Sequence, residues 1–178
     1  MAFFIGLMIK NNKIYIKLEA INESNWEACA KLKLTKDQKN NLPNNLHSIA
    51  ELNFYPQTKA VAILNEKNII IGFSTFGIPE NESIPKIFRF MIDKKYQTKG
   101  YGKAAFIEII KEIFSKYQPR EIHVYYHPNK IQLTNFYTGV GFKEIKILDC
   151  KNRKEGKMLA IIKYDDFSLA ERDYKSLP

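Results

Sequence analysis

The sequence predicts a single α/β domain with a mixed, mostly antiparallel sheet of about seven strands and about four flanking helices. Two observations support this fold class. The predicted elements form a central β-α-β-α unit with strand pairs before and after it. The chain also has 178 residues, of which 45% are hydrophobic and 13% aromatic, which is enough for one hydrophobic core.

The first half of the chain is expected to hold three strands and two helices. Residues 13–18 alternate in the two-residue period of a strand. Asn22 is suited to cap a helix that carries Trp26, Cys29 and Ala30 on one side. The other predicted elements are a helix near 46–54 and strands at 59–64 and 69–76, with a hairpin turn at 65–68.

The second half is expected to alternate strands with helices and to end in a strand pair. The helix after Gly102 has apolar residues at core spacing and stops before Pro119. The predicted elements are strands at 86–92, 121–126, 142–148 and 157–164 and helices at 104–117 and 129–138. We therefore divide the chain into an N-terminal extension (1–12), a domain (13–164) and a polar, mostly peripheral C-terminal tail (165–178).

Composition narrows the compartment and the partners. Cys29 and Cys150 are far apart and form no Cys-x-x-Cys pair, so we expect neither a zinc site nor a disulfide framework, and a reduced, cytoplasmic setting fits. The apolar stretch 1–9 is too short to span a bilayer and lacks the features of a signal peptide, so we expect no membrane association. Met8 is an alternative start.

The chain carries 28 Lys and Arg against 19 Asp and Glu, a net charge of +9, which suggests an anionic partner. These charges are dispersed, without an Arg-rich tract, so we do not expect nucleic acid as a partner. Some lysines nevertheless gather around one short segment. They are Lys94, Lys95, Lys99 and Lys103.

That segment is the most informative one in the chain, because it joins a predicted strand to a predicted helix. It consists of Gln97, Thr98, Lys99, Gly100, Tyr101, Gly102 and Lys103. A glycine turn into a helix directs unpaired backbone N–H groups and the positive end of the helix dipole at one point, which favours a phosphate. The spacing matches neither the nucleoside-triphosphate loop nor the dinucleotide loop.

The pattern Q-x-x-G-x-G resembles the pyrophosphate loop of the GCN5-related N-acetyltransferases, which bind acetyl-CoA. Downstream, the segment 135–142 (NFYTGVGF) is similar to the second signature of that family. The resemblance implies that Tyr137 stands beside the CoA sulfur. A phenol at that position can protonate the departing thiolate as a general acid.

The resemblance is closest to bacterial diamine (spermine/spermidine) N-acetyltransferases. It rests on the segments 48–51, 60–63, 71–73 and 89–97 and extends from about residue 13 to about residue 163. It implies direct acetyl transfer from acetyl-CoA to a polyamine or diamine, with no metal and a homodimer as one option for the assembly. Two alternatives remain open: another amine, such as a protein N-terminus, a lysine or an antibiotic, and a catalytically silent protein that binds acyl-CoA.

The resemblance also implies that the strands at 87–92 and 121–126 splay apart. The pantetheine of CoA would then lie in the gap and bind main-chain groups of Phe90, Met91 and Ile92. The family usually has an asparagine seven residues before the tyrosine, but Lys130 stands there. Either Asn129 takes this role after a shift of one residue, or the contact to CoA is lost, and Asn135 is the second substitute.

No general base can be named from the sequence. Glu51 is the first candidate for holding a cationic substrate, followed by Glu82 and Asp93. His123 and His127 are interpreted as structural, because no acidic or cysteine residue is seen beside them.

Overall fold

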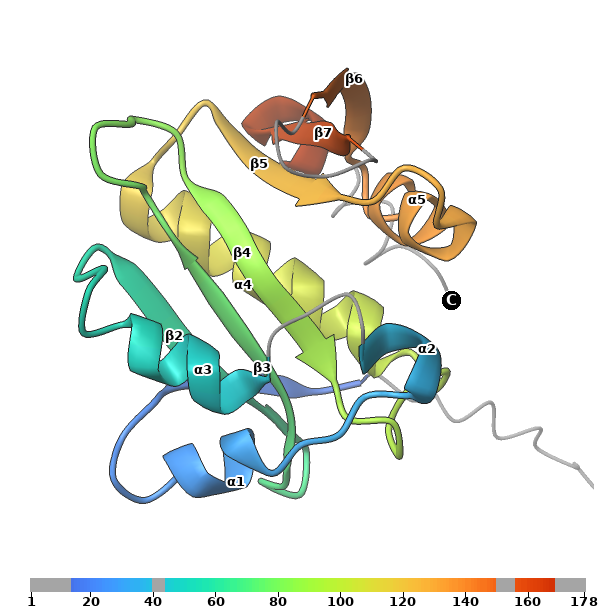
Figure 1. The fold of residues 1–178 in the computed structure, drawn as a ribbon. Helices are drawn as coiled ribbons and strands as arrows, with labels where there is room; N and C mark the ends of the chain where they lie inside the picture. Colours follow the sequence, from blue (N-terminus) through green and yellow to red (C-terminus); the bar gives the residue numbers. More distant parts are fainter. Residues whose placement is uncertain (1–13, 40–43, 150–155, 169–178) are drawn as a thin grey trace, which may run out of the picture.

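The computed structural model describes residues 14–39, 44–149 and 156–168. Within them, seven strands form one sheet in the order β1-β2-β3-β4-β5-β7-β6 (Figure 1). The strands are β1 (Ile16–Ala20), β2 (Thr58–Asn65), β3 (Ile70–Gly77), β4 (Lys86–Ile92), β5 (Glu121–Tyr126), β6 (Lys143–Leu148) and β7 (Lys157–Lys163). All neighbours pair antiparallel except β4 and β5, which are parallel. The predicted fold class is confirmed.

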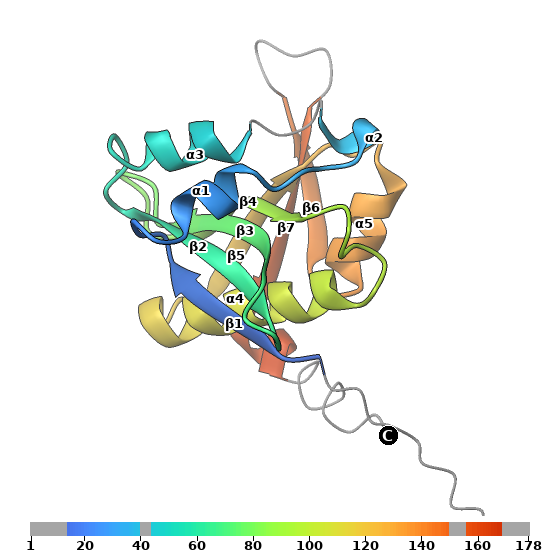
Figure 2. The ribbon, with the colours of Figure 1, turned by 90° about the horizontal axis from the view of Figure 1, so that it is seen from below.

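Five helices accompany the sheet in the described residues: α1 (Trp26–Ala30), α2 (Lys36–Lys39), α3 (Asn45–Glu51), α4 (Tyr101–Tyr117) and α5 (Ile131–Thr138). The two views agree that α1 and α3 cover one face of the sheet and α4 the other (Figures 1 and 2). The helix α4 is the crossover that parallel strands such as β4 and β5 require. The helix α2 was not predicted, because four residues are too short to show a helical period.

Two local predictions about helix starts were wrong. Asn25, not Asn22, stands at the N-cap of α1, and the Asn22 side chain instead accepts a hydrogen bond from the Ser24 N–H (2.8 Å). The helix α4 begins at Tyr101 rather than at residue 104, because Gly100 adopts φ 84° and forms its N-cap. Only a residue that tolerates the left-handed region fits there easily.

The core lies on both faces of the sheet. Apolar residues at the predicted spacing of α4, including Phe106, Ile109, Ile110 and Ile113, are fully buried against the sheet. On the other face, a smaller cluster around Phe73 joins the sheet to the α1–α3 layer. Each such side chain stabilises the fold by about 1.5–3 kcal/mol when it leaves water.

The tail that was predicted to be mostly peripheral has one buried side chain in its described part. Residues 164–168 form a helical turn, and Phe167 is only 4% exposed. Its ring lies against Phe114 of α4, with centroids 5.5 Å apart. The predicted extension (1–12), Met8 and Cys150 lie outside the described residues. In the described ranges, no helix has the length and hydropathy needed to cross a membrane.

Candidate functional site

The strands β4 and β5 diverge at the centre of the sheet. These two strands share two residue pairs, Lys86 with His123 and Ile87 with Val124. Beyond these pairs, β4 continues to Ile92 and β5 to Tyr126 without pairing to each other. Figure 1 shows the two arrows separating toward their carboxyl ends. The β5-facing edge of residues 88–91 therefore has no strand partner among the described residues. Such an edge offers main-chain donors and acceptors to an extended ligand.

The glycine loop follows directly from the end of β4. Thr98 (φ 61°) and Gly100 (φ 84°) turn the chain into α4, whose N-cap has no side-chain hydrogen bond. The Ala104 N–H bonds to the Gly100 carbonyl at 3.2 Å, so the helical bonds of α4 begin there. The N–H groups before a first helical bond point out of the helix, and the dipole adds positive potential at the same point.

Gln97 ties this loop to its surroundings. Its Nε2 atom donates to the Ile92 carbonyl (2.8 Å) and to Oε1 of Gln38 (2.9 Å). The side chain therefore fixes the loop at the end of β4 and against α2. Its predicted role in binding the donor stays a prediction, and the structure assigns it this supporting contact.

The lysines around the loop are all exposed. Lys99 lies over the Tyr96 ring, 5.8 Å from its centroid, and donates to the Lys95 carbonyl (2.8 Å). Tyr101 donates to Glu66 at 3.1 Å, and desolvation together with this bond raises the pKa of Tyr101. Asp93 is the only acid within residues 93–103, against four lysines, so the loop has positive potential that favours phosphates.

Tyr137 lies on α5 within a group of aromatic rings. Its ring stacks on Tyr126, with centroids 4.7 Å apart, and meets Phe106, Phe136 and Phe142 edge-on. Burial raises the pKa of the Tyr137 phenol above its usual value, and the Tyr126 phenol adds to this rise. Because burial favours the uncharged form, Tyr137 is protonated at neutral pH, as a proton donor must be.

A hydrogen-bonded group beside Tyr137 was missed in the sequence. The Tyr126 hydroxyl donates to Glu144, and the Thr134 hydroxyl donates to the same carboxylate oxygen at 3.1 Å. Burial and the bond to Glu144 raise the pKa of Tyr126 to about 12. Strand alternation places Tyr126 on the buried face, but no local signal pairs it with a residue of β6.

The histidines of this region differ from the sequence interpretation in one respect. His123 does have an acidic neighbour, because its Nε2 lies 2.7 Å from Glu121, two residues earlier on the same face of β5. His127 lies after the end of β5. Lys130 stands at the N-cap of α5 without a side-chain bond, and Asn129 lies in the preceding turn, so the family asparagine's role stays a prediction for Asn129.

A cavity of about 630 Å³ opens on the α3 face of the sheet. Its charged lining residues are Glu51 of α3, Glu80 of the β3–β4 loop and Arg89 of β4. Phe54 and Tyr55 line it as well, and they are 79% and 58% exposed. Glu51, the first candidate for holding a cation, is thus a lining residue, and its carboxylate lies 3.5 Å from His47 Nδ1.

A β-bulge directs β4 into this cavity. Phe76 pairs with Ile87 and Thr75 with Arg89, which leaves Phe88 as an extra residue. Phe88 and Arg89 consequently both line the cavity, although strand alternation would send them to opposite faces. The bulge follows the last β4–β5 pair, so the cavity reaches the point where the strands part.

The other two acidic candidates lie elsewhere. Glu82 is paired with Lys86 at 2.7 Å and does not line the cavity. Asp93 is 7% exposed, and its two oxygens accept the N–H groups of Lys33 (2.8 Å) and Lys95 (2.9 Å). These contacts make Asp93 the residue that joins the chain after β4 to the segment after α1.

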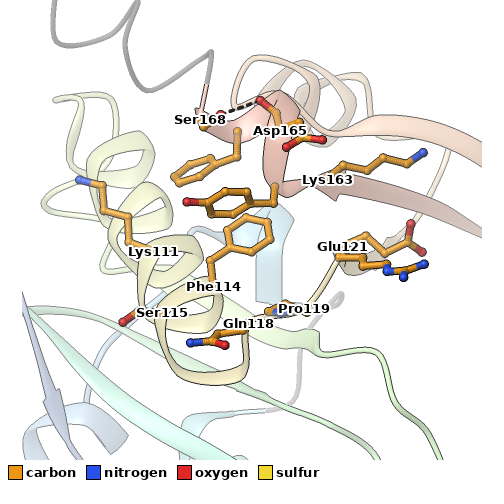
Figure 3. Close-up of a pocket in the computed structure, with 12 residues that line it drawn as sticks. Lys111, Phe114, Ser115, Gln118, Pro119, Glu121, Lys163, Asp165 and Ser168 are labelled. Carbon is orange, nitrogen blue, oxygen red and sulfur yellow. Dashed lines mark hydrogen bonds between the residues drawn. The ribbon is translucent and has the colours of Figure 1, made fainter.

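A larger cavity of about 1090 Å³ lies at the opposite end of α4 (Figure 3). Lys111, Phe114, Lys163 and Asp165 are among the residues that line it. At a rise of 1.5 Å per residue, the length of α4 separates it from the glycine loop by about 20–25 Å. None of the predicted site residues is among those that line it. The size of a cavity alone therefore does not identify the functional site.

Comparison with known proteins decides the family. Residues 33–155 match the acetyltransferase (GNAT) domain family. The chain belongs to this family. A probable spermine N(1)-acetyltransferase of Bacillus subtilis subsp. natto is 27% identical over 148 residues, which cover 78% of this chain and 95% of that protein.

Solved structures share the fold of this GNAT protein. Spermidine N-acetyltransferase from Vibrio cholerae, in complex with CoA and spermine, has a TM-score of 0.69 at 12% identity over 86% of this chain and 98% of its own. A GCN5-related N-acetyltransferase from Brucella melitensis has a TM-score of 0.74 at 10% identity over 91% and 81%, respectively.

Family membership confirms an N-acetyltransferase with acetyl-CoA as its cosubstrate. The described residues fit acetyl-CoA. The positive glycine loop suits its phosphates, and the open edge of β4 suits its amide-containing arm. Within the described residues, no three His, Cys, Asp or Glu side chains gather as a metal site would require.

Proposed function

We propose that this enzyme transfers the acetyl group of acetyl-CoA directly to a primary amine of a small polyamine or diamine, such as spermidine or spermine. The observation that carries the proposal is the cavity that holds Glu51 and Glu80 and reaches the point where β4 and β5 part. An amine bound there would be directed at the donor edge of β4. The name of the Bacillus relative supports the same substrate class.

On the donor side, the loop 97–103 would bind the pyrophosphate through backbone N–H groups, helped by the surrounding lysines. The edge of Phe90, Met91 and Ile92 would hold the pantetheine in an extended form beside β5. CoA supplies the activated thioester, and the protein supplies orientation, which accounts for a large part of the rate enhancement in such reactions.

Tyr137 would act on the leaving group. Its phenol is protonated at neutral pH, and a hydrogen bond from it stabilises the negative charge that develops on the CoA sulfur. The aromatic contacts with Phe106, Tyr126 and Phe142 hold the ring in one orientation. No covalent acyl-enzyme is needed.

On the acceptor side, the carboxylates would select a substrate with a second cation. Glu51 and Glu80 lie on different elements and attract ammonium groups, and the exposed rings of Phe54 and Tyr55 add cation–π attraction. The net charge of +9 repels polycations at long range, but salt screens this repulsion beyond about 8 Å at physiological ionic strength. The local acids therefore dominate in the cavity.

The proposal extends to compartment and assembly. Cys29 is a buried free thiol whose pKa burial raises to about 12, which suits a cytoplasmic protein with reduced cysteines. The edge strand β6 exposes Ile145 (51%) and Ile147 (58%), and an apolar sheet edge of this kind supports a homodimer. Light scattering on the purified protein tests the assembly.

The activity is tested by incubating the enzyme with acetyl-CoA and a panel of amines and measuring free thiol. We expect thiol release with spermidine and spermine above that with monoamines of similar length. Turnover only with protein N-termini, lysine side chains or amine antibiotics would favour the other amines. Binding of acetyl-CoA without turnover of any amine would favour a silent acyl-CoA-binding protein.

Replacement of Glu51 by glutamine tests the acceptor site. We expect Glu51→Gln to raise KM for spermidine roughly tenfold, because one partly shielded charge pair contributes about 1.4 kcal/mol or somewhat more. A monoamine, which lacks the distal cation, should be nearly unaffected. Glu82→Gln is the matched control, since Glu82 is paired with Lys86 outside the cavity. Equal losses for both substrates would show that Glu51 acts in folding or proton transfer.

A further inference from the structure

Two residues that line the same cavity each have a buried polar atom without a partner. Among the described residues, three buried side-chain atoms have no hydrogen-bond partner: Ser48 Oγ, Arg89 Nε and His127 Nδ1. Ser48 and Arg89 both line the 630 Å³ cavity beside Glu51. A buried donor left without an acceptor destabilises the folded protein, so a ligand that pairs with such atoms recovers that free energy.

The chemistry of these atoms restricts the ligand. A guanidinium group only donates hydrogen bonds, and a serine hydroxyl can donate as well. The ammonium groups of a polyamine also only donate, so they cannot satisfy Arg89. The partner of Arg89 must bring an acceptor, which in a substrate of this enzyme means an oxygen atom.

Among the described residues, no protein acceptor pairs with the Nε atom of Arg89. Its Nη1 donates to the Phe88 carbonyl at 2.9 Å, and the described residues show no ion pair between Arg89 and either glutamate of the cavity. The cavity thus has two anionic side chains, Glu51 and Glu80, and one cation, Arg89, that no carboxylate of the described residues neutralises. This arrangement suits a ligand that carries both an ammonium group and an oxygen acceptor.

We propose that Arg89 and Ser48 form an oxygen-binding subsite of the acceptor cavity. This inference rests on the proposed function and extends its substrate class to diamines that also bear a carboxylate, such as diamino acids. The thioester carbonyl of the donor also offers an oxygen acceptor. Arg89 could reach it, because Arg89 lies where β4 leaves β5. Both atoms are covered in this structure, so binding requires a change of side-chain rotamer.

The test compares acceptors that differ only by a carboxylate: ornithine with putrescine, and lysine with cadaverine. For the wild-type enzyme we expect kcat/KM to favour the amino acid of each pair by about 10–100-fold, as expected for a hydrogen bond to a charged group. Arg89→Gln should remove this preference by lowering kcat/KM for the amino acid alone. If the oxygen belongs to the thioester, Arg89→Gln should instead lower kcat by one common factor for all acceptors.

Controls separate binding from folding. Thermal unfolding and calorimetric CoA binding of Arg89→Gln should match the wild type, as should those of Arg120→Gln, an exposed arginine outside the cavity. If Arg89→Gln fails to fold, Ser48→Ala provides the test instead. It removes the second group of the subsite and should show the same change in kcat/KM. Unchanged kinetics for every acceptor in folded variants would overturn the subsite while the proposed function stands. No thiol release by the wild type with any amine would overturn both.

Discussion

Replacement of Tyr137 by phenylalanine is expected to lower kcat about 10²–10⁴-fold with little change in the affinity for acetyl-CoA. The loss would arise in the transition state, because the phenol stabilises the sulfur only as negative charge develops on it. Steady-state kinetics with a saturating amine, together with calorimetric titration of CoA, measure the two quantities separately. The raised pKa of Tyr137 keeps its phenol protonated through neutral and mildly alkaline pH. The ratio of the wild-type kcat to the kcat of Tyr137→Phe should therefore stay constant over this pH range.

The substitution should leave the fold intact. Phenylalanine retains the ring that stacks on Tyr126 and contacts Phe106 and Phe142, so the aromatic packing around α5 is preserved. Tyr15→Phe is the matched control, since that ring is 61% exposed. Turnover by Tyr137→Phe within a few-fold of the wild type would show that Tyr137 only packs against its neighbours.

The parts of the site that could be predicted are those that depend on a short stretch of sequence. The run from Gln97 to Lys103 could be recognised because glycine spacing, the preceding strand and the following helix are all local. Tyr137 was proposed in the same way, from its own motif, and its role stays a prediction. The helix α4 was predicted because its apolar residues repeat at the helical period, and only its start was displaced by the cap at Gly100.

The parts that could not be predicted depend on contacts between distant residues. The bulge at Phe88 arises from the pairing of β4 with β3, and it sends Arg89 into the cavity against the alternation that the sequence suggests. The bond between Tyr126 and Glu144 joins two strands that are not neighbours in the sheet. Phe167 follows two aspartates in a polar segment, and only the docking of its ring on Phe114 makes it a core residue.

The second large effect is expected for CoA binding when a glycine of the loop is replaced. The structure shows which of the two glycines can be replaced without disturbing the fold. A side chain at Gly100 would meet Ile14 Cδ1 at 2.6 Å and would require φ 84°, so Gly100→Val perturbs the fold itself. A Cβ at Gly102 meets only Phe136 Cε2 at 3.7 Å and Ile92 Cγ1 at 3.9 Å, which are ordinary contacts. The test of ligand binding therefore belongs to Gly102.

We expect Gly102→Val to fold normally and to weaken CoA binding by about 10²–10⁴-fold, because two charge-assisted hydrogen bonds to the pyrophosphate would be lost at about 1.5–3 kcal/mol each. The Cβ points toward Ile92 and Phe136, so the valine methyl groups would occupy the space beside the end of β4 that the donor needs. Calorimetric titration with CoA and thermal unfolding measure affinity and stability on the same sample. Ser115→Val places the same side chain on an exposed position near the other end of α4 and should bind CoA like the wild type. Unchanged affinity in folded Gly102→Val would mean that the donor phosphates bind elsewhere than at the start of α4.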